Sequence, residues 1–106
     1  MPKYLFQASY VGEGVKGLLK EGGSKRREAV AHAIEGMGGT LEEFYYAFGD
    51  DDVFAIAELP DNVSTAALTL LINASGAAKV KTVVLLTPEE IDQATKKSIE
   101  YRPPGR

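Results

Sequence analysis

The stretch TLEEFYYAFGDDDVFAIAEL, residues 40–59, contains two apolar runs separated by a glycine and three aspartates. Both runs are rich in aromatic and branched side chains, which is typical of β-strands. Glycine and aspartate are typical turn residues, because they accept the backbone conformations that tight turns need. We therefore predict strands over Thr40–Phe48 and Asp52–Leu59, paired as a hairpin around a two-residue turn at Asp50-Asp51.

Both faces of this hairpin carry large apolar groups. In the predicted register one face pairs aromatic with small residues: Phe48 with Val53, Tyr46 with Ala55 and Phe44 with Ala57. The other face carries Ala47, Tyr45, Glu43, Phe54, Ile56 and Glu58. A slip of one residue would exchange the two faces. Because a solvated face would be more uniformly polar, the second face predicts an interface, namely a homodimer packed sheet to sheet around a small cavity.

The sequence before the hairpin predicts one strand and one interrupted helix. Residues 3–10 alternate with period two and predict a strand. Apolar residues then recur at helical spacing from residue 12 to residue 37. Gly22-Gly23 predicts a break in this helix, with Ser24 able to cap the second part, and Gly38-Gly39 predicts its end.

The sequence after the hairpin predicts a helix, a strand and a short final helix. Asn62 is the expected cap of the first, whose apolar face comprises Val63, Ala66, Ala67, Leu70, Leu71 and Ala74. A strand follows over Lys79–Leu86, and Thr87-Pro88-Glu89-Glu90 has the pattern of a capping box. The last helix is expected to end near Lys97, and residues 100–106 form an extended tail, which either clasps a partner subunit or frays.

The order strand, helix, strand, strand, helix, strand predicts an α+β fold of the ferredoxin-like type. Right-handed crossovers give a four-stranded antiparallel sheet with both long helices on one face. The chain of 106 residues has the length of one domain, so we expect residues 1–106 to fold as a single unit. The bare sheet face is then free to form a dimeric α+β barrel.

Composition limits the expected partners. The net charge of −3 disfavours nucleic acid, which requires a concentrated positive patch. No apolar run approaches the roughly 20 residues that cross a bilayer, and the first ten residues lack the pattern of a signal peptide. The sequence has no cysteine. We expect a cytoplasmic protein that binds neither nucleic acid nor membrane.

The segments KYLFQASY, GEGVKGLLKEGGSKRREAV, FYYAFGDDDVFAIAELPDN and VKTVVLLTPEEIDQATKKS resemble the GYD domain family over nearly the whole chain. The family signature, Gly-x-Tyr-Asp, corresponds to residues 49–52. Gly49 and Asp52 match it, whereas Asp51 stands in place of the tyrosine, so no role of that tyrosine carries over. The resemblance implies a bacterial-type cytoplasmic dimer with an α+β barrel and an activity that is largely uncharacterised in the family.

Four residues are candidates for a ligand site. Tyr45, Glu43 and Glu58 share the bare sheet face in the predicted register, where two opposed carboxylates repel each other unless a proton or cation intervenes. They form either a polar pocket inside the dimer or edge charges that prevent aggregation. His32 is the only histidine. It is either a general base or, more simply, an exposed helix residue.

The three aspartates are best explained as a turn, with a structural role for Asp52, paired with a nearby basic residue, as an alternative. A metal site is disfavoured because consecutive strand residues point to opposite faces and cannot all bind one ion. We predict neither metal nor cofactor. The favoured function is small-molecule binding or an accessory role; a cofactor-free monooxygenase or isomerase and a structural or stress-related interaction module are the alternatives.

Overall fold

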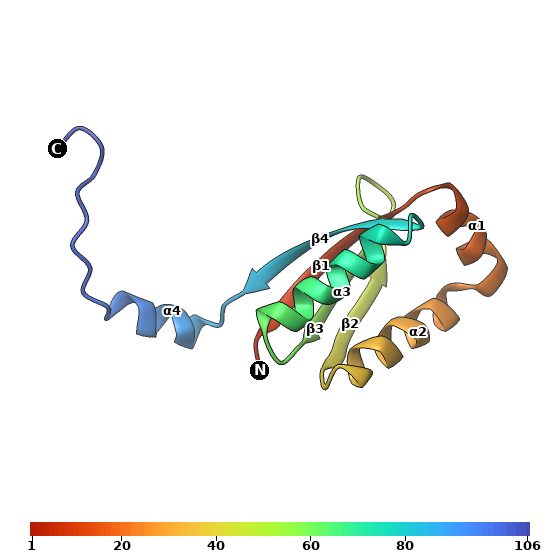
Figure 1. Ribbon diagram of the computed structural model, residues 1–106, viewed down its shortest axis with the longest axis horizontal. Coiled ribbons are helices and arrows are strands. Elements are labelled where there is room, and N and C mark those ends of the chain that lie inside the picture. The colour runs from red at the N-terminus through yellow and green to blue at the C-terminus, as the bar shows by residue number, and fades with distance from the viewer.

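The computed structural model describes residues 1–106 as a four-stranded sheet with four helices (Figure 1). The elements, in chain order, are β1 (Lys3–Tyr10), α1 (Gly12–Glu21), α2 (Gly23–Gly36), β2 (Thr40–Tyr46), β3 (Val53–Glu58), α3 (Asn62–Ala74), β4 (Ala78–Leu85) and α4 (Pro88–Thr95). The strands lie in the order β2-β3-β1-β4, and all neighbours are antiparallel. The predicted ferredoxin-like fold is therefore confirmed.

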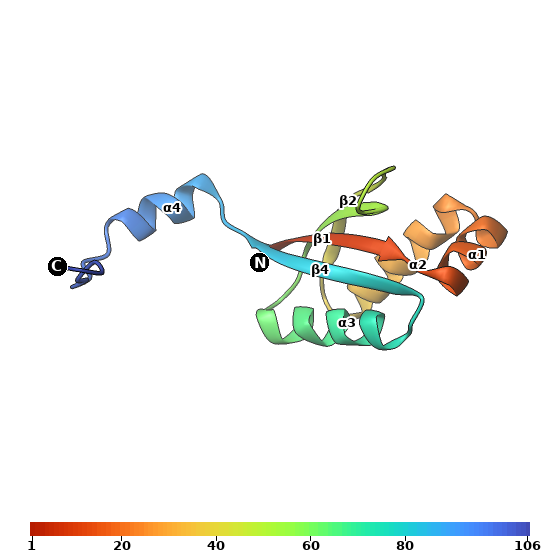
Figure 2. The ribbon, with the colours of Figure 1, turned by 90° about the horizontal axis from the view of Figure 1, so that it is seen from above.

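The core lies between the sheet and two helices. Helix α2 packs over β2 and α3 packs over β4, so the helices cover opposite edges of the sheet (Figure 2). The buried side chains between them come mainly from alternate positions of β1 and β3, as period two requires. They are Tyr4, Phe6, Val53, Ala55, Ala57, Val80, Ile34 and Leu59.

The helix between β1 and β2 breaks where the sequence predicts. Gly22 takes φ +85°, a conformation that glycine adopts without strain. Helix α2 starts at the next residue without a side-chain cap, so the predicted cap at Ser24 is wrong. Gly38 also has positive φ and follows the end of α2, as expected.

Helix α3 turns a different face to the sheet from the one predicted. Its buried or half-buried positions are Ser64, Thr65, Leu68, Thr69 and Ile72. The threonines tolerate this face because their hydroxyls are paired. The Oγ1 of Thr65 donates to Asp61 O at 2.9 Å, and that of Thr69 lies 2.7 Å from Thr82 Oγ1. The apolar face expected in the core therefore points to solvent.

The predicted cap of α3 is wrong, and the predicted capping box of α4 is confirmed. Asp61, not Asn62, caps α3: its Oδ1 accepts from the Ser64 N–H at 2.7 Å. The amide oxygen of Asn62 accepts instead from the Tyr4 hydroxyl at 2.5 Å. The capping box of α4 is present, with Thr87 and Glu90 bonding to each other's backbone. No helix is long and apolar enough to cross a membrane.

The hairpin register differs from the prediction by two residues. Tyr46 pairs with Val53 and Phe44 with Ala55, so residues 47–52 form a six-residue loop. A two-residue primed turn needs positive φ at its central residues, and no residue other than glycine takes positive φ here. Because the shift is two and not one, the predicted division of β2 and β3 into two faces survives.

Candidate functional site

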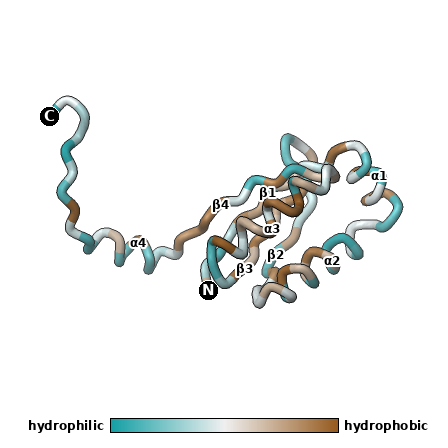
Figure 3. Tube along the Cα trace, in the orientation of Figure 1, coloured by the Kyte–Doolittle hydropathy of each residue, from teal (hydrophilic) through white to brown (hydrophobic).

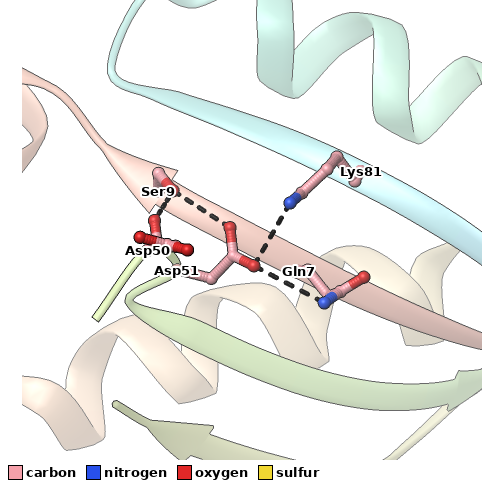
Figure 4. A network of polar contacts seen from close by, with 5 residues as sticks. All are labelled: Gln7, Ser9, Asp50, Asp51 and Lys81. Atoms are coloured by element: carbon pink, nitrogen blue, oxygen red, sulfur yellow. Dashed lines mark hydrogen bonds and ion pairs between the residues drawn. The ribbon is translucent and has the colours of Figure 1, made fainter. Parts of the chain in front are cut away.

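The three aspartates belong to the loop between β2 and β3, and two of them bind β1 by their side chains. The carboxylate of Asp51 lies 3.3 Å from Lys81 Nζ, 3.2 Å from Ser9 Oγ and 3.5 Å from Gln7 Nε2 (Figure 4). The single proton of the Ser9 hydroxyl is shared between this carboxylate and the carbonyl oxygen of Asp50, which lies 2.9 Å from Ser9 Oγ. Asp51 thus fastens the loop to β1 and β4 on the sheet face away from the helices.

Asp52 fastens the same loop from the backbone side. Its Oδ2 accepts from the Tyr10 N–H at 2.8 Å, and its own N–H donates to Ala8 O at 2.8 Å. Its carboxylate therefore continues the pairing of β3 with β1 beyond the last regular residue. The structural role considered for Asp52 fits this geometry, although its partner is a backbone group and not a base. Gly49 is exposed in the loop.

The predicted constellation of Tyr45, Glu43 and Glu58 is only partly assembled. Glu43 pairs with Ile56, whereas Glu58 pairs with Thr40 at the far end of β3, so the two glutamates are not opposite each other. The cause is the register shift together with a β-bulge between Leu41 and Glu43. His32 is exposed on α2 and lies outside this group.

Tyr45 and Glu43 are neighbours on the edge strand β2. A hydrogen bond to the Glu43 carboxylate and its negative charge raise the pKa of the Tyr45 phenol. The phenol therefore stays protonated at neutral pH, which suits a donor and not a base. Beside them the bulged Glu42 pairs with Lys3 at 3.0 Å, and this bond raises the pKa of Lys3.

An apolar hollow lies on the other side of the sheet, where the loop meets the first two helices. It has a volume of about 390 Å³ and is open on one side. We call it the Tyr10 hollow; it is lined by Tyr10, Val15, Leu18, Gly23, Tyr46, Ala47, Phe48 and Asp52. A concave, mostly apolar surface with a few polar groups is the usual form of a small-molecule site.

Two tyrosines supply most of the polar groups of the Tyr10 hollow. The Tyr46 hydroxyl donates to Gly23 O at 3.0 Å, and its ring meets the ring of Phe44 edge to face, with centroids 5.3 Å apart. Partial burial, with the Tyr10 phenol beside it, raises the pKa of Tyr46. The hydrogen bond and the ring contact fix the position of Tyr46, and the raised pKa keeps its phenol protonated. This arrangement is suited to binding an apolar molecule that has one polar group.

A second apolar space lies beneath the helices, next to the Tyr10 hollow. This space has a volume of about 110 Å³ and lies between α2, α3 and the central strands. Its apolar walls include Val30 and Ile34 of α2, and Leu68 and Ile72 of α3. The space exists because the two helices cover opposite edges of the sheet. Tyr10 borders both spaces.

The sequence pattern contained part of the signal for this site. Strand alternation places Tyr46 on the helix side of the hairpin, and period two places Tyr10 on the side of Phe6. What it did not show is the six-residue loop, which brings Phe48 and Asp52 to the hollow. Neither Tyr45 nor His32 lines this hollow.

A comparison with protein-family models gives a match for this chain. The model of the GYD domain family matches residues 4–95, from the second residue of β1 to the end of α4. No curated protein matches the chain. The signature positions Gly49 and Asp52 belong to the loop whose acids bind β1. With the match extending over most of its 106 residues, the chain belongs to the GYD domain family.

Proposed function

We propose that this protein binds a small, largely apolar molecule in the Tyr10 hollow. The observation that carries the proposal is the hollow itself, an open apolar space of about 390 Å³ bordered by two phenols. Surfaces of this kind favour apolar ligands because burial contributes about 25 cal/mol per Å² of apolar area. The adjoining space beneath α2 and α3 gives an apolar ring or chain further room.

The polar groups of the Tyr10 hollow indicate which polar group the ligand carries. Tyr46 already donates its proton to Gly23 O, so its oxygen is left as an acceptor. The Tyr10 phenol supplies a donor or an acceptor nearby. A molecule with one hydroxyl or carbonyl group on an apolar frame satisfies both demands, whereas a strongly charged one loses hydration in an apolar space.

We further propose that the sheet face away from the helices is covered by a second copy of the chain. We call this the outer face; its apolar side chains are Leu5, Tyr45, Phe54, Ile56, Val83 and Leu85. Tyr45, Phe54 and Val83 are exposed in the isolated chain. An exposed apolar patch that crosses all four strands is typical of a protein interface.

The binding proposal is tested by titrating a probe into matched variants. Val15→Trp fills the hollow from α1, whereas Lys16→Trp adds the same side chain at an exposed position that does not line it. Benzyl alcohol and acetophenone serve as probes, with binding followed by amide chemical shifts. We expect saturable shifts near Tyr10 and Tyr46 in the wild type and in Lys16→Trp, and their loss in Val15→Trp. Saturable shifts confined to Tyr45 and Glu43 would place the site elsewhere.

A further inference from the structure

Helix α3 has an apolar surface that nothing in the isolated chain covers. No residue of α3 is charged. Its solvent side comprises Val63, Ala66, Ala67, Leu70, Leu71 and Ala74, and Figure 3 shows the tube of α3 brown over much of its length. Leu70 is 69% exposed and Leu71 is 71% exposed. An exposed apolar patch of this kind usually marks an interaction surface, so this side of α3 is suited to a partner.

A groove runs beside this surface, between α3 and the edge strand β4. It has a volume of about 360 Å³, and its accessible surface is almost wholly apolar. Ala66, Leu70 and Val84 provide the apolar walls, and Thr69 and Thr82 bond to each other in its floor. No charged residue lines it. We call it the α3–β4 groove; it is shallow and open, and its uncharged, mostly apolar surface suits an apolar side chain.

The same chain contains a helix that lacks a partner. Every residue from Leu86 to Arg106 is exposed, and α4 projects away from the sheet (Figure 1). Helices shorter than about 12–15 residues are marginal in water without tertiary packing, and α4 has 8. Pro88, Ile91 and Ala94 share one apolar side of α4. Glu89 and Asp92 lie on another, so α4 has one side to bury and one to leave in water.

The connection to α4 directs it away from its own groove. Thr87 is extended, with φ −75° and ψ 159°, and Pro88 after it disfavours the helical conformation at this position. The chain therefore continues beyond the end of β4 and does not turn back over α3 (Figure 2). Because α4 extends away from its own sheet, the groove that it can reach is that of another molecule.

We propose that α4 of one copy docks in the α3–β4 groove of a second copy, with Ile91 as its central contact. The exchange is reciprocal in a two-fold pair, so each copy gives one arm and receives one. The uncharged groove takes the apolar side of α4, and the acidic side stays in water. The contact differs from the one proposed for the outer face, because it lies on the helix side of the sheet.

The test uses single cysteines, which are unambiguous because the chain has none of its own. A ¹⁵N-labelled Leu70→Cys variant is mixed with unlabelled Ile91→Cys and oxidised at micromolar concentration. Docking gives the two thiols an effective concentration in the millimolar range. We expect at least about tenfold more heavy–light disulfide dimer than with Leu19→Cys in place of Leu70→Cys. Leu19 is 81% exposed but lies on α1, outside the groove.

Two results would overturn the proposal. The first is an equal yield of heavy–light dimer from Leu70→Cys and from the Leu19→Cys control. The second comes from the double variant Leu70→Cys/Ile91→Cys at high dilution: a disulfide within one chain would show that α4 folds back on its own α3. Circular dichroism of each variant confirms that the fold is retained, since all three positions are exposed.

Discussion

The Oδ2 of Asp51 lies 3.3 Å from the Nζ of Lys81, so one ion pair joins the loop after β2 to the edge strand β4 across β1. The two partners are unequally placed. Asp51 has a side chain only 10% exposed, whereas Lys81 is 66% exposed. The carboxylate also accepts from Ser9 and Gln7. Asp51 is thus the centre of the contact and Lys81 its exposed end.

Replacing Asp51 is therefore expected to cost more than replacing Lys81. Asp51→Ala removes an ionised acceptor and leaves the Gln7 amide without it, whereas Ser9 can still donate to Asp50 O. The loss of this charged acceptor corresponds to about 1–3 kcal/mol of unfolding free energy. Lys81→Ala removes an exposed ion pair and should cost less than about 1 kcal/mol. Urea unfolding followed by circular dichroism measures both.

Asp50→Ala is the matched control for this pair. Asp50 contacts Ser9 through its backbone carbonyl and not its carboxylate, so the variant should unfold within about 0.5 kcal/mol of the wild type. Equal losses for Asp50→Ala and Asp51→Ala would show that the Asp51 carboxylate does not hold the loop.

Two glycines of α1 should respond in opposite directions to alanine. A Cβ at Gly14 would overlap the carbonyl oxygen of Ala77, so the helix must shift, at a cost of about 1–3 kcal/mol. A Cβ at Gly17 meets nothing within 4 Å. Gly17→Ala should therefore stabilise the protein by about 0.5–1 kcal/mol through helix propensity. Thermal unfolding of both variants decides this; a stabilised Gly14→Ala would mean that α1 does not pack against Ala77.

The cap of α3 predicts how stability depends on pH. Hydrogen bonding from Ser64 lowers the pKa of Asp61 below its ordinary value of 3.8. A carboxyl with a lower pKa in the folded state stabilises above pH 3.8, and that contribution is lost as pH falls through the folded pKa. Asp61→Asn keeps a capping oxygen but cannot titrate. The unfolding free energy of Asp61→Asn should fall less than that of the wild type between pH 5 and pH 2, as measured by urea unfolding at each pH. An equal fall in both proteins would contradict the role of Asp61 as a cap.

The outer face predicts a dimer that a single charge weakens. Phe54 lies on this face in the middle strand β3, so Phe54→Lys would place an unpaired charge in an apolar contact. Light scattering after size exclusion should give a dimer for the wild type at micromolar concentration. For Phe54→Lys it should give a weaker association, with a larger monomer fraction on dilution, because the α4 contact does not involve Phe54. Leu19→Lys, on α1, serves as control and should remain dimeric. A monomeric wild type at this concentration would reject the outer-face contact.

The elements and the topology could be predicted from the sequence because their signals are local. Period two identified β1 to the residue, and the capping box at Thr87 identified the start of α4. Gly22 marked the break between α1 and α2 for an equally local reason, since its backbone takes positive φ.

The rest depends on tertiary contacts that no local pattern encodes. The hairpin loop is set by Asp51 and Asp52 binding β1, residues more than 40 positions away. The face of α3 was predicted wrongly because Thr65 and Thr69 count as polar until their partners are known. The expected pairing of Glu43 with Glu58 was wrong because it depended on the predicted hairpin register. The Tyr10 hollow could not be predicted because its lining depends on where the loop and α1 lie.

The most direct test of small-molecule binding is native mass spectrometry of the protein purified from its own host, with a denaturing run in parallel. We predict that the native protein has additional mass from one small apolar molecule per chain, that denaturation releases it, and that Val15→Trp lacks it while Lys16→Trp retains it. Bare protein under native conditions, or the same additional mass on Val15→Trp, would contradict binding in the Tyr10 hollow.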